Sequence, residues 1–218
     1  MREKTESTIA FETRHGEAAR LHSPSAARNR DAVGDLLAKL LPAGGEVLEI
    51  GSGTGEHAVA ACERRPDISW QPSDRDAASR DSQDAWAAQS GAAMRPALDL
   101  DLLAPAWDAG LGLYDALVCL NVIHIAPWAV AEALARVATQ HVSPGGFVFL
   151  YGPFLEGDAT AQSNLAFDQS LRSRDPAWGV RSLHDVEALF AKTGWLRHER
   201  HEMPANNLSL VFRHRSAF

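Results

Sequence analysis

A glycine-rich loop that follows an acidic residue is the segment of this sequence best suited to bind a ligand. The stretch "EVLEIGSGTGEHA" covers residues 46–58 and places Gly51, Gly53 and Gly55 at every second position. Glycine lets a backbone turn tightly and approach a ligand closely. The apolar run before the loop predicts a strand, and the residues after it predict a helix. Glu49 stands at the end of the strand, so a carboxylate lies beside whatever binds over the loop.

The charge of Glu49 separates two classes of ligand. A dinucleotide fingerprint would place its third glycine at position 56, where Glu56 stands. A carboxylate repels a pyrophosphate and attracts a cation. S-adenosylmethionine carries a sulfonium and an ammonium and no phosphate, so we expect it as the cofactor, with S-adenosylhomocysteine as its product. An NAD-dependent oxidoreductase is the less favoured alternative.

Further acidic residues follow the next two predicted strands. Asp74 lies 19 residues past Gly55, where many nucleotide-binding proteins hold the hydroxyls of an adenosine ribose. We expect Asp74, the adjacent Arg75 and Ser52 of the loop in the cofactor site. Asp99 ends the third strand and either accepts a hydrogen bond from the adenine amino group or caps a turn.

Strand-like and helix-like segments alternate along the chain. The periodicity predicts helices over about 25–41, 56–65, 76–89, 128–141, 160–175 and 183–193. It predicts strands over 46–50, 68–73, 94–100, 147–151, 195–203 and 207–215, and another at the beginning of residues 114–125. Apolar strands separated by helices are typical of a parallel sheet covered on both faces. Only "PANN" joins the last two strands, which is too short for a parallel crossover, so we expect an antiparallel hairpin there.

The chain is expected to form one domain over residues 25–218, preceded by an arm over residues 1–24. The arm lacks periodicity and is rich in charge, Ser and Thr. A mobile tail and a lid over the ligand both fit such a segment. Arg28 and Asn29 begin the first predicted helix, upstream of the glycine loop, and we place them over the cofactor.

Several segments carry a resemblance to a known family, namely "VLEIGSGTGEHA", "WQPSDRD", "NVIHIAPW", "LYGPF", "SNLAFDQSLRSRDPAWGVR" and "MPANNLSLVF". They resemble the class I methyltransferase-like proteins, in the family that includes methyltransferase-like protein 26. The likeness runs from about Ser25 to Phe212. It implies an α/β, Rossmann-like class I methyltransferase fold. The implied sheet is mostly parallel, with seven strands in the order 3-2-1-4-5-7-6 and an antiparallel last strand.

The same resemblance implies roles for individual residues. Glu49, Gly51, Gly53 and Asp74 would line the cofactor site, with Asp99 near adenine. Glu56 departs from the family pattern, because relatives are expected to carry Gln at this position. An added negative charge suits the start of a helix but weakens any anion site there.

The acceptor side is expected beyond the carboxyl ends of the strands, where ligands of open α/β sheets bind. Asn121 and His124 follow the fourth strand, and we assign Asn121 to the cofactor site. His124 is the candidate general base, although a structural histidine fits this position as well. The remaining pocket is expected to contain Tyr151, Phe154, Asn164, Asp168, Arg181 and Asn206. Pairing of Arg181 with Asp168 or Asp185, and a turn at Asn206, are the alternatives.

Composition bounds the function further. The chain has 218 residues and a formal net charge of −7, with no long run of Lys or Arg, so we expect no nucleic-acid partner. We also expect a cytoplasmic protein with no membrane partner, since no apolar stretch is long enough to cross a bilayer. His, Cys, Asp and Glu show no metal-ligand spacing, so no metal is expected. The predicted function is methyl transfer from S-adenosylmethionine to a small-molecule acceptor. The alternative is a non-catalytic S-adenosylmethionine-binding protein that acts through a partner.

Overall fold

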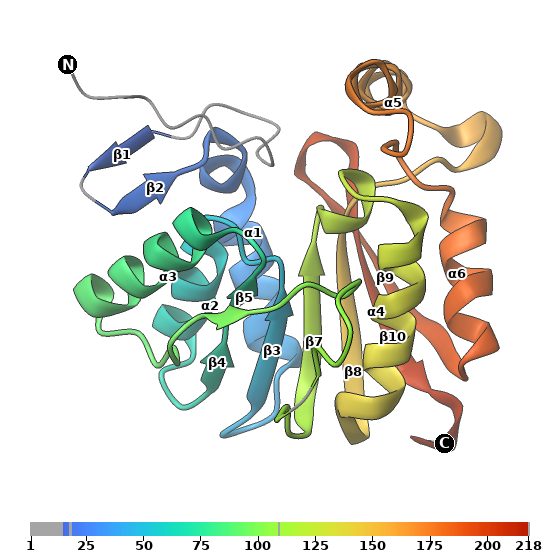
Figure 1. Cartoon of the computed structure of the whole chain (residues 1–218). Helices are drawn as coiled ribbons and strands as arrows, with labels where there is room; N and C mark the ends of the chain where they lie inside the picture. Colours follow the sequence, from blue (N-terminus) through green and yellow to red (C-terminus); the bar gives the residue numbers. More distant parts are fainter. Residues whose placement is uncertain (1–14, 18, 109, 218) are drawn as a thin grey trace.

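A mainly parallel β-sheet forms the centre of the computed structural model, which describes residues 15–17, 19–108 and 110–217 (Figure 1). The six strands of this sheet lie in the spatial order β4 (Ser69–Gln71), β3 (Glu46–Ile50), β7 (Tyr114–Leu120), β8 (Val142–Pro153), β10 (Asn207–His214) and β9 (Trp195–Met203). β10 runs antiparallel to both of its neighbours, β8 and β9. The predicted α/β class and the predicted antiparallel last strand are therefore confirmed.

The third strand of the predicted order is detached from the main sheet. β5 (Ser73–Asp74) pairs in parallel with β6 (Leu98–Asp99) as a separate two-stranded sheet. Pro72 separates β4 from β5, and proline has no N–H with which to continue a ladder. A single parallel bridge between Trp70 and Met94 links the two parts. The strands thus follow the order 3-2-1-4-5-7-6, with the second strand broken in two.

Helices connect the strands and cover both faces of the sheet: α1 (Pro24–Leu40), α2 (Glu56–Arg64), α3 (Ala77–Ser90), α4 (Trp128–His141), α5 (Gln162–Arg174) and α6 (Leu183–Lys192). Three of them begin at a side-chain cap of the kind that the sequence signals. The caps are Ser23 for α1, Asp76 for α3 and Ser182 for α6, and each side chain accepts an N–H from the first turn of its helix.

Two hydrophobic cores lie on opposite faces of the sheet, because side chains alternate along each strand. In β3, Val47 packs in one core with Leu37 of α1, whereas Leu48 packs in the other with Leu134 of α4. Both cores consist of fully buried side chains. Glu49 follows Leu48 and lies on the face that Val47 shares, so the strand carries its acid into a buried layer.

The expected N-terminal arm is partly ordered. β1 (His15–Glu17) and β2 (Arg20–His22) form an antiparallel pair, which the sequence analysis missed because strands of three residues show no periodicity. β2 is fastened to α3, since Ser82 Oγ accepts the N–H of Leu21 and Trp86 Nε1 donates to the carbonyl of Leu21. Residues 1–14 of the arm lie outside the described residues.

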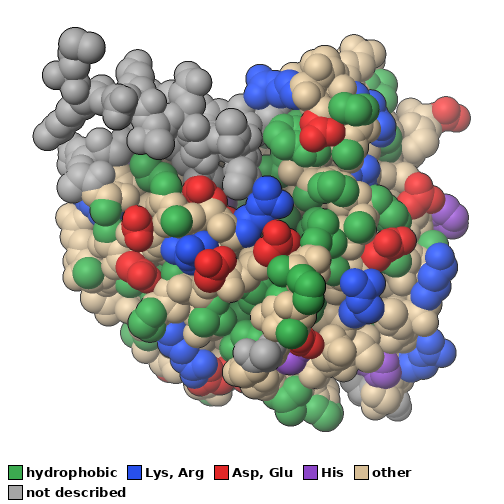
Figure 2. Space-filling view, in the orientation of Figure 1, with side chains coloured by type: hydrophobic (Ala, Val, Ile, Leu, Met, Phe, Trp, Pro, Cys, Tyr) green, Lys and Arg blue, Asp and Glu red, His purple; other side chains and the backbone are tan. Residues whose placement is uncertain are grey.

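The outer surface is mixed in charge. On the face shown in Figure 2, acidic and basic side chains are interspersed over the described residues. No helix in the described part of the chain is long and apolar enough to cross a membrane. Figure 1 shows the β1–β2 hairpin and α5 at the end of the molecule toward which β3 and β7 point. This end is the one where the glycine loop emerges from the sheet.

Gly51 offers a test of how tightly that loop packs. Its φ is +67°, and an added Cβ would lie 2.6 Å from Cγ2 of Val122. Gly91 has the same φ of +67° but faces open space, which makes it a matched control. We expect Gly91→Ala to lower the free energy of unfolding by about 1–2 kcal/mol through backbone strain alone. Gly51→Ala should lower it by roughly a further 1–3 kcal/mol through overpacking. Urea unfolding measures both, and equal losses would show that the loop has room to spare.

Candidate functional site

A cavity of about 690 Å³ opens at the carboxyl ends of β3, β5 and β7. It is lined by residues that are far apart in the sequence and belong to α1, the glycine loop, the ends of four strands and α5. Most of the predicted site residues face it: Arg28, Asn29, Glu49, Gly51, Ser52, Gly53, Asp74, Arg75, Asn121, His124, Tyr151 and Asn164. The fold therefore brings the predicted cofactor and acceptor residues to one place.

The remaining predicted residues lie away from this cavity. Phe154 is buried in the core, with its ring edge-on to His124 at 5.3 Å between centroids. Asp168 pairs with Arg172 one turn further along α5 and also accepts the N–H of Val180. Asn206 donates to Ser163 Oγ at the hairpin tip, while its neighbour Asn207 is the residue that lines the cavity.

Arg181 has a structural role that the sequence analysis did not foresee. Its guanidinium donates to three backbone carbonyls, those of Ile123 (2.8 Å), Ala126 (2.6 Å) and Ala177 (2.8 Å). It therefore ties the segment before α6 to the short helix η1 (Val122–His124). These three carbonyls hold the side chain of Arg181 in place of the expected substrate or Asp185.

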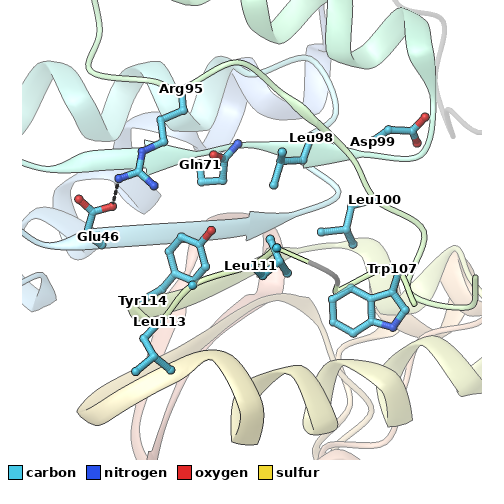
Figure 3. A pocket seen from close by; sticks show the side chains of 12 residues that line it. Glu46, Gln71, Arg95, Leu98, Asp99, Leu100, Trp107, Leu111, Leu113 and Tyr114 are labelled. Atoms are coloured by element: carbon cyan, nitrogen blue, oxygen red, sulfur yellow. Dashed lines mark hydrogen bonds and ion pairs between the residues drawn. The ribbon is translucent and has the colours of Figure 1, made fainter. Parts of the chain in front are cut away.

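Asp99 borders a second, smaller cavity of about 450 Å³ (Figure 3). Figure 3 shows its carboxylate at the edge of that cavity, and it pairs with Arg80 at 3.1 Å. Tyr114, Trp107 and an ion pair between Arg95 and Glu46 form other parts of the wall. The predicted contact of Asp99 with adenine is therefore not supported by its position. Leu100, the next residue, lines both cavities.

The amides of the glycine loop are hydrogen-bonded within the protein. Ser52 N donates to the carbonyl of Ser73 (2.8 Å), Gly53 N donates to Asp74 Oδ2 (3.0 Å), and Gly55 N donates to the carbonyl of Ser52 (3.1 Å). A phosphate-binding loop needs its amides free for the anion. These three amides are already occupied, so the loop is poorly suited to hold a pyrophosphate.

Glu49 is a buried acid with few stabilising contacts. Glu49 is 1% exposed, and Trp70 Nε1 donates a hydrogen bond to Glu49 Oε2 at 3.0 Å. Burial raises the pKa of Glu49 to about 7, and the nearby charge of Asp74 acts in the same direction. A cation in the cavity would favour the ionised form. Glu49 is therefore placed to bind a positive group and to release a proton when it does so.

Asp74 holds the loop as well as facing the cavity. Its Oδ2 accepts the N–H of Gly53, and its Oδ1 accepts the N–H of Asp76 at 3.0 Å. A ligand was the favoured expectation for this carboxylate, with a structural strand-end acid as the alternative, and its bonds to the loop support a structural role beside the expected one. A carboxylate oxygen has more than one lone pair, so these bonds leave acceptor capacity for a ligand.

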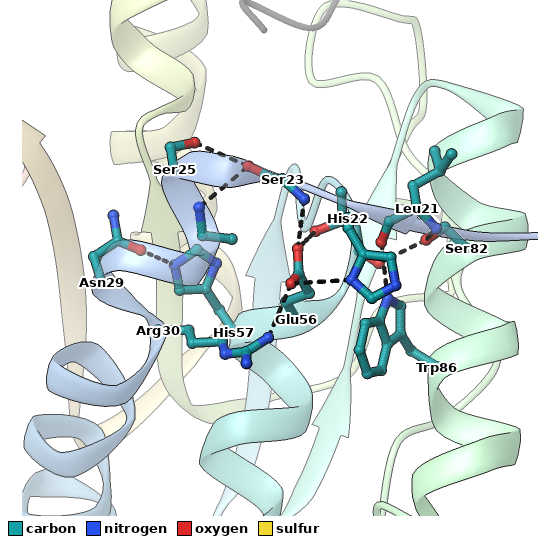
Figure 4. A network of polar contacts seen from close by, with 12 residues as sticks. Leu21, His22, Ser23, Ser25, Asn29, Arg30, Glu56, His57, Ser82 and Trp86 are labelled. Carbon is teal, nitrogen blue, oxygen red and sulfur yellow. Dashed lines mark hydrogen bonds and ion pairs between the residues drawn. The ribbon is translucent and has the colours of Figure 1, made fainter. Parts of the chain in front are cut away.

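Glu56 fastens the start of α1 to the start of α2 (Figure 4). Its carboxylate is buried and accepts the backbone N–H of Ser23 (2.8 Å), the hydroxyl of Thr54 (2.9 Å) and the guanidinium of Arg30 (3.0 Å). His22 lies 3.7 Å from the same carboxylate. These contacts give a physical reason for an acid at position 56.

A hydrogen-bonded chain links α2, α1 and β8 across the cavity wall. The amide of Asn29 accepts from His57 Nε2 (2.7 Å) and donates to the hydroxyl of Tyr151 (3.0 Å). An amide oxygen only accepts, so Nε2 of His57 carries a hydrogen. Burial lowers the pKa of His57 to about 4, and the ring is neutral near pH 7. The sequence analysis missed His57, because only its contact with Asn29 distinguishes it from other histidines.

His124 lines the cavity, but its surroundings do not suit a general base. Its Nδ1 accepts the backbone N–H of Arg181 at 3.3 Å, so in the neutral ring the hydrogen sits on Nε2. That Nε2 is buried and has no hydrogen-bond partner among the described residues. Burial and the charge of Arg181 lower the pKa of His124 to about 3. A neutral imidazole has one basic lone pair, and in His124 the lone pair on Nδ1 already accepts the N–H of Arg181. A structural role therefore fits this side chain better than that of a general base.

Solved structures with a similar arrangement of strands and helices show the fold class to which this chain belongs. An O-methyltransferase family protein from Burkholderia thailandensis superposes with a TM-score of 0.73 at 16% identity, over 84% of this chain and 55% of its own. An O-methyltransferase family 2 protein from Planctomyces limnophilus, in complex with apigenin, superposes with a TM-score of 0.71 at 18% identity. The match covers 87% of this chain and 59% of that protein. The O-methyltransferase NcsB1 of neocarzinostatin biosynthesis, in complex with S-adenosylmethionine and a naphthoic acid, superposes with a TM-score of 0.70 at 17% identity. The match covers 87% of this chain and 54% of NcsB1. The fold is therefore that of the Rossmann-like methyltransferases.

The chain spans just over half the length of these solved structures. Within that fold class it belongs to the family described as "Protein of unknown function (DUF938)", whose model matches residues 20–214. That match includes the β2 strand, the glycine loop and the C-terminal hairpin.

The role of Glu56 as a fastener can be tested by hydrogen exchange. We expect Glu56→Gln to speed amide exchange over residues 20–30, because it leaves Arg30 without a charged partner and disturbs the bond to Ser23 N. The free energy of unfolding should fall by about 1–3 kcal/mol, the cost of unsatisfied buried groups. Glu63→Gln, at an exposed position of the same helix, is the control and should change neither quantity. Unchanged exchange in Glu56→Gln would show that other contacts hold this segment.

Proposed function

We propose that this protein transfers a methyl group from S-adenosylmethionine to a small-molecule acceptor. One observation carries the proposal: a cavity of about 690 Å³ is lined by a glycine loop with occupied amides and by the buried carboxylate of Glu49, to which the neutral indole of Trp70 donates. Such a site favours an adenosyl ligand that is positive at its reactive end. It disfavours NAD, because the buried carboxylates of Glu49 and Asp74 line the cavity beside the glycine loop and would repel a pyrophosphate.

The residues present fit this cofactor. Glu49 would bind its ammonium, and Asp74 would accept hydrogen bonds from the ribose hydroxyls. Leu100 and Leu102 line the cavity beside Asp74 and offer apolar contact for the adenine ring. Asp101, between them, also faces the cavity and replaces Asp99 as the candidate partner of the adenine amino group. Arg28, on the first turn of α1, is suited to the carboxylate of the ligand.

The chemistry needs few groups from the protein. S-adenosylmethionine would supply an activated methyl group to a lone pair of the acceptor, with S-adenosylhomocysteine as the leaving product and the acceptor proton released to solvent. The protein's part is to orient the acceptor in line with the methyl group and to exclude water. α1 and α5 close the two sides of the cavity, and His57 and Tyr151 present polar groups to its interior.

The comparisons support the proposal at the level of the class. NcsB1 is in complex with S-adenosylmethionine, and two of the similar structures hold small aromatic compounds, apigenin and a naphthoic acid. The finer likeness to the family that includes methyltransferase-like protein 26 rests on the sequence segments given above.

Calorimetry with S-adenosylmethionine, S-adenosylhomocysteine and NAD tests the cofactor directly. Binding of the two adenosyl ligands without binding of NAD is expected. A panel of small phenols, amines, thiols and carboxylates then tests turnover by mass spectrometry. Binding without any methylated product would favour the non-catalytic alternative, and binding of NAD alone would overturn the proposal.

The pKa of Glu49 predicts a pH dependence of cofactor affinity. Only the ionised acid attracts the ammonium, so affinity for S-adenosylmethionine should rise roughly 10- to 30-fold from about pH 5.5 to about pH 7.5. Glu49→Gln should flatten this rise and weaken binding at pH 7.5. Glu46→Gln, at the other end of β3, is the control and should keep the wild-type profile. A Glu49→Gln profile identical to wild type would remove Glu49 from the cofactor site.

The raised pKa of Glu49 also predicts how the Glu49→Gln variant changes the free energy of unfolding of the ligand-free protein. The folded pKa of Glu49, about 7, lies above its ordinary value of 4.5, so the folded state holds the proton longer than the unfolded state. Its contribution therefore destabilises the fold as pH rises from about 4.5 to about 7. Glu49→Gln should raise the free energy of unfolding by about 1–3 kcal/mol at pH 8 and by little at pH 4.5. Denaturant unfolding at the two pH values measures the difference.

Asp74 and Asp99 form a matched pair for the adenosine end. Asp74→Asn keeps an oxygen for Gly53 N but loses the charge, so affinity for S-adenosylhomocysteine should fall about 10- to 100-fold. Asp99→Asn lies outside the main cavity and should leave affinity within about twofold. Calorimetry at one pH gives both values. The reverse ranking would restore Asp99 to the cofactor site.

A further inference from the structure

The hydroxyl of Tyr151 lies at the wall of the main cavity between two amide side chains. Asn29 Nδ2 donates to it at 3.0 Å, and the side chain of Asn207, whose Nδ2 donates to the carbonyl of Pro204 at 2.9 Å, lies near it. Both amides line the same cavity, from α1 and from the start of β10. Tyr151 itself comes from β8, so three elements that are distant in sequence meet at this one oxygen.

The direction of these hydrogen bonds determines what the hydroxyl can offer a ligand. Asn29 must present its N–H to Tyr151, because its oxygen already accepts from His57. Burial raises the pKa of Tyr151, but both amides lower it, as N–H donors to a phenol oxygen do. A phenol oxygen accepts at most two such bonds and keeps one hydrogen of its own. Because Asn29 is the donor in its bond to Tyr151, the phenol keeps its own O–H hydrogen for another acceptor, and Tyr151 lines the cavity.

The surroundings of Tyr151 indicate the shape of the partner. We call the part of the cavity formed by β8, α5 and the C-terminal hairpin the acceptor end. Phe167 and Trp178 contribute aromatic rings there, and Pro153 adds an apolar face. Asp175 is the charged residue of this end, and its Oδ1 accepts the backbone N–H of Ala177 at 2.8 Å. Rings, amides and the hydroxyls of Tyr151 and Ser163, of which Ser163 Oγ already accepts from Asn206, favour a flat molecule with an oxygen.

We propose, building on the proposed function, that Tyr151 selects the methyl acceptor by donating a hydrogen bond to an oxygen of a planar aromatic compound. Asn29 acts as the positioning residue, because it fixes the orientation of the hydroxyl. Asn29 lies between Ser23 and Arg30, which both bind Glu56, so an ordered α1 start is a condition for this geometry. A substrate lacking an oxygen next to its methylated group is expected to bind poorly.

The chain contains two tyrosines, which allows a direct measurement. Protein labelled with carbon-13 at the tyrosine Cζ should show one resonance from Tyr151 and one from Tyr114, which borders the second cavity. Tyr114→Phe assigns the signals and is the matched control. With saturating S-adenosylhomocysteine, addition of catechol should shift the Tyr151 resonance and leave that of Tyr114 in place. Aniline, a ring of similar size without oxygen, should move neither.

Affinity measurements complete the test. Tyr151→Phe should weaken catechol binding about tenfold, the scale of one lost hydrogen bond, and keep S-adenosylhomocysteine affinity within about twofold. Asn29→Leu should weaken catechol to a similar degree, and the double variant should be no worse than either single one, as expected for two residues that act as a unit. A merely structural role for Asn29 would instead give additive losses.

The outcomes distinguish the two proposals. If S-adenosylhomocysteine binds while catechol leaves the Tyr151 resonance unmoved, or if aniline shifts it equally, the inference about Tyr151 is wrong and the proposed function stands. If no adenosyl ligand binds, the proposed function itself fails.

Discussion

The buried carboxylate of Glu56 is the contact on which the geometry of the cavity depends. It is bonded on one side to Ser23 and Arg30 and on the other to Thr54, so it joins the beginning of α1 to the end of the glycine loop. Asn29 lies between its two α1 partners and makes the bonds to His57 and Tyr151. A single interaction thus sets the position of one cavity wall relative to the other.

Electrostatics explains why this loop differs from a nucleotide-phosphate loop of similar sequence. Glu49, Asp74 and Glu56 are all buried around the three glycines. Asp74 occupies the amide of Gly53 that an anion would otherwise use. Burying three carboxylates is costly unless each is hydrogen-bonded or meets a cation. Asp74 and Glu56 are bonded by several donors, whereas Glu49 has fewer and keeps a raised pKa. The remaining demand for positive charge is therefore concentrated at Glu49.

The features that sequence could predict are those encoded locally. The strand, loop and helix around residue 51 follow from periodicity and glycine spacing, and the short "PANN" connection requires the antiparallel hairpin that is observed. The helix predicted over residues 183–193 is observed as α6, Leu183–Lys192. These signals lie within a few residues of the element that they define.

The features that sequence analysis missed depend on contacts between distant segments. Arg181 was expected to meet a carboxylate or a substrate, yet it binds three carbonyls that only the fold brings near. Asp99 is the last residue of the detached strand β6 and borders a different cavity from Asp74. At the hairpin tip, the left-handed conformation of Asn206 turns its side chain toward Ser163 and leaves Asn207 at the cavity. None of these outcomes has a local signal.

The edge strand β9 has a consequence for how this molecule behaves at high concentration. An exposed sheet edge offers unpaired backbone groups to which a strand of another chain can add. The middle of β9 reads "RHERHE", and several of these charges are held in ion pairs, Arg197 with Glu187 and Arg200 with Glu156. A strand from another chain could add to this edge only next to these charged side chains, and it would have to break their ion pairs. The C-terminal hairpin that completes the cavity thereby also protects the sheet against edge-to-edge aggregation.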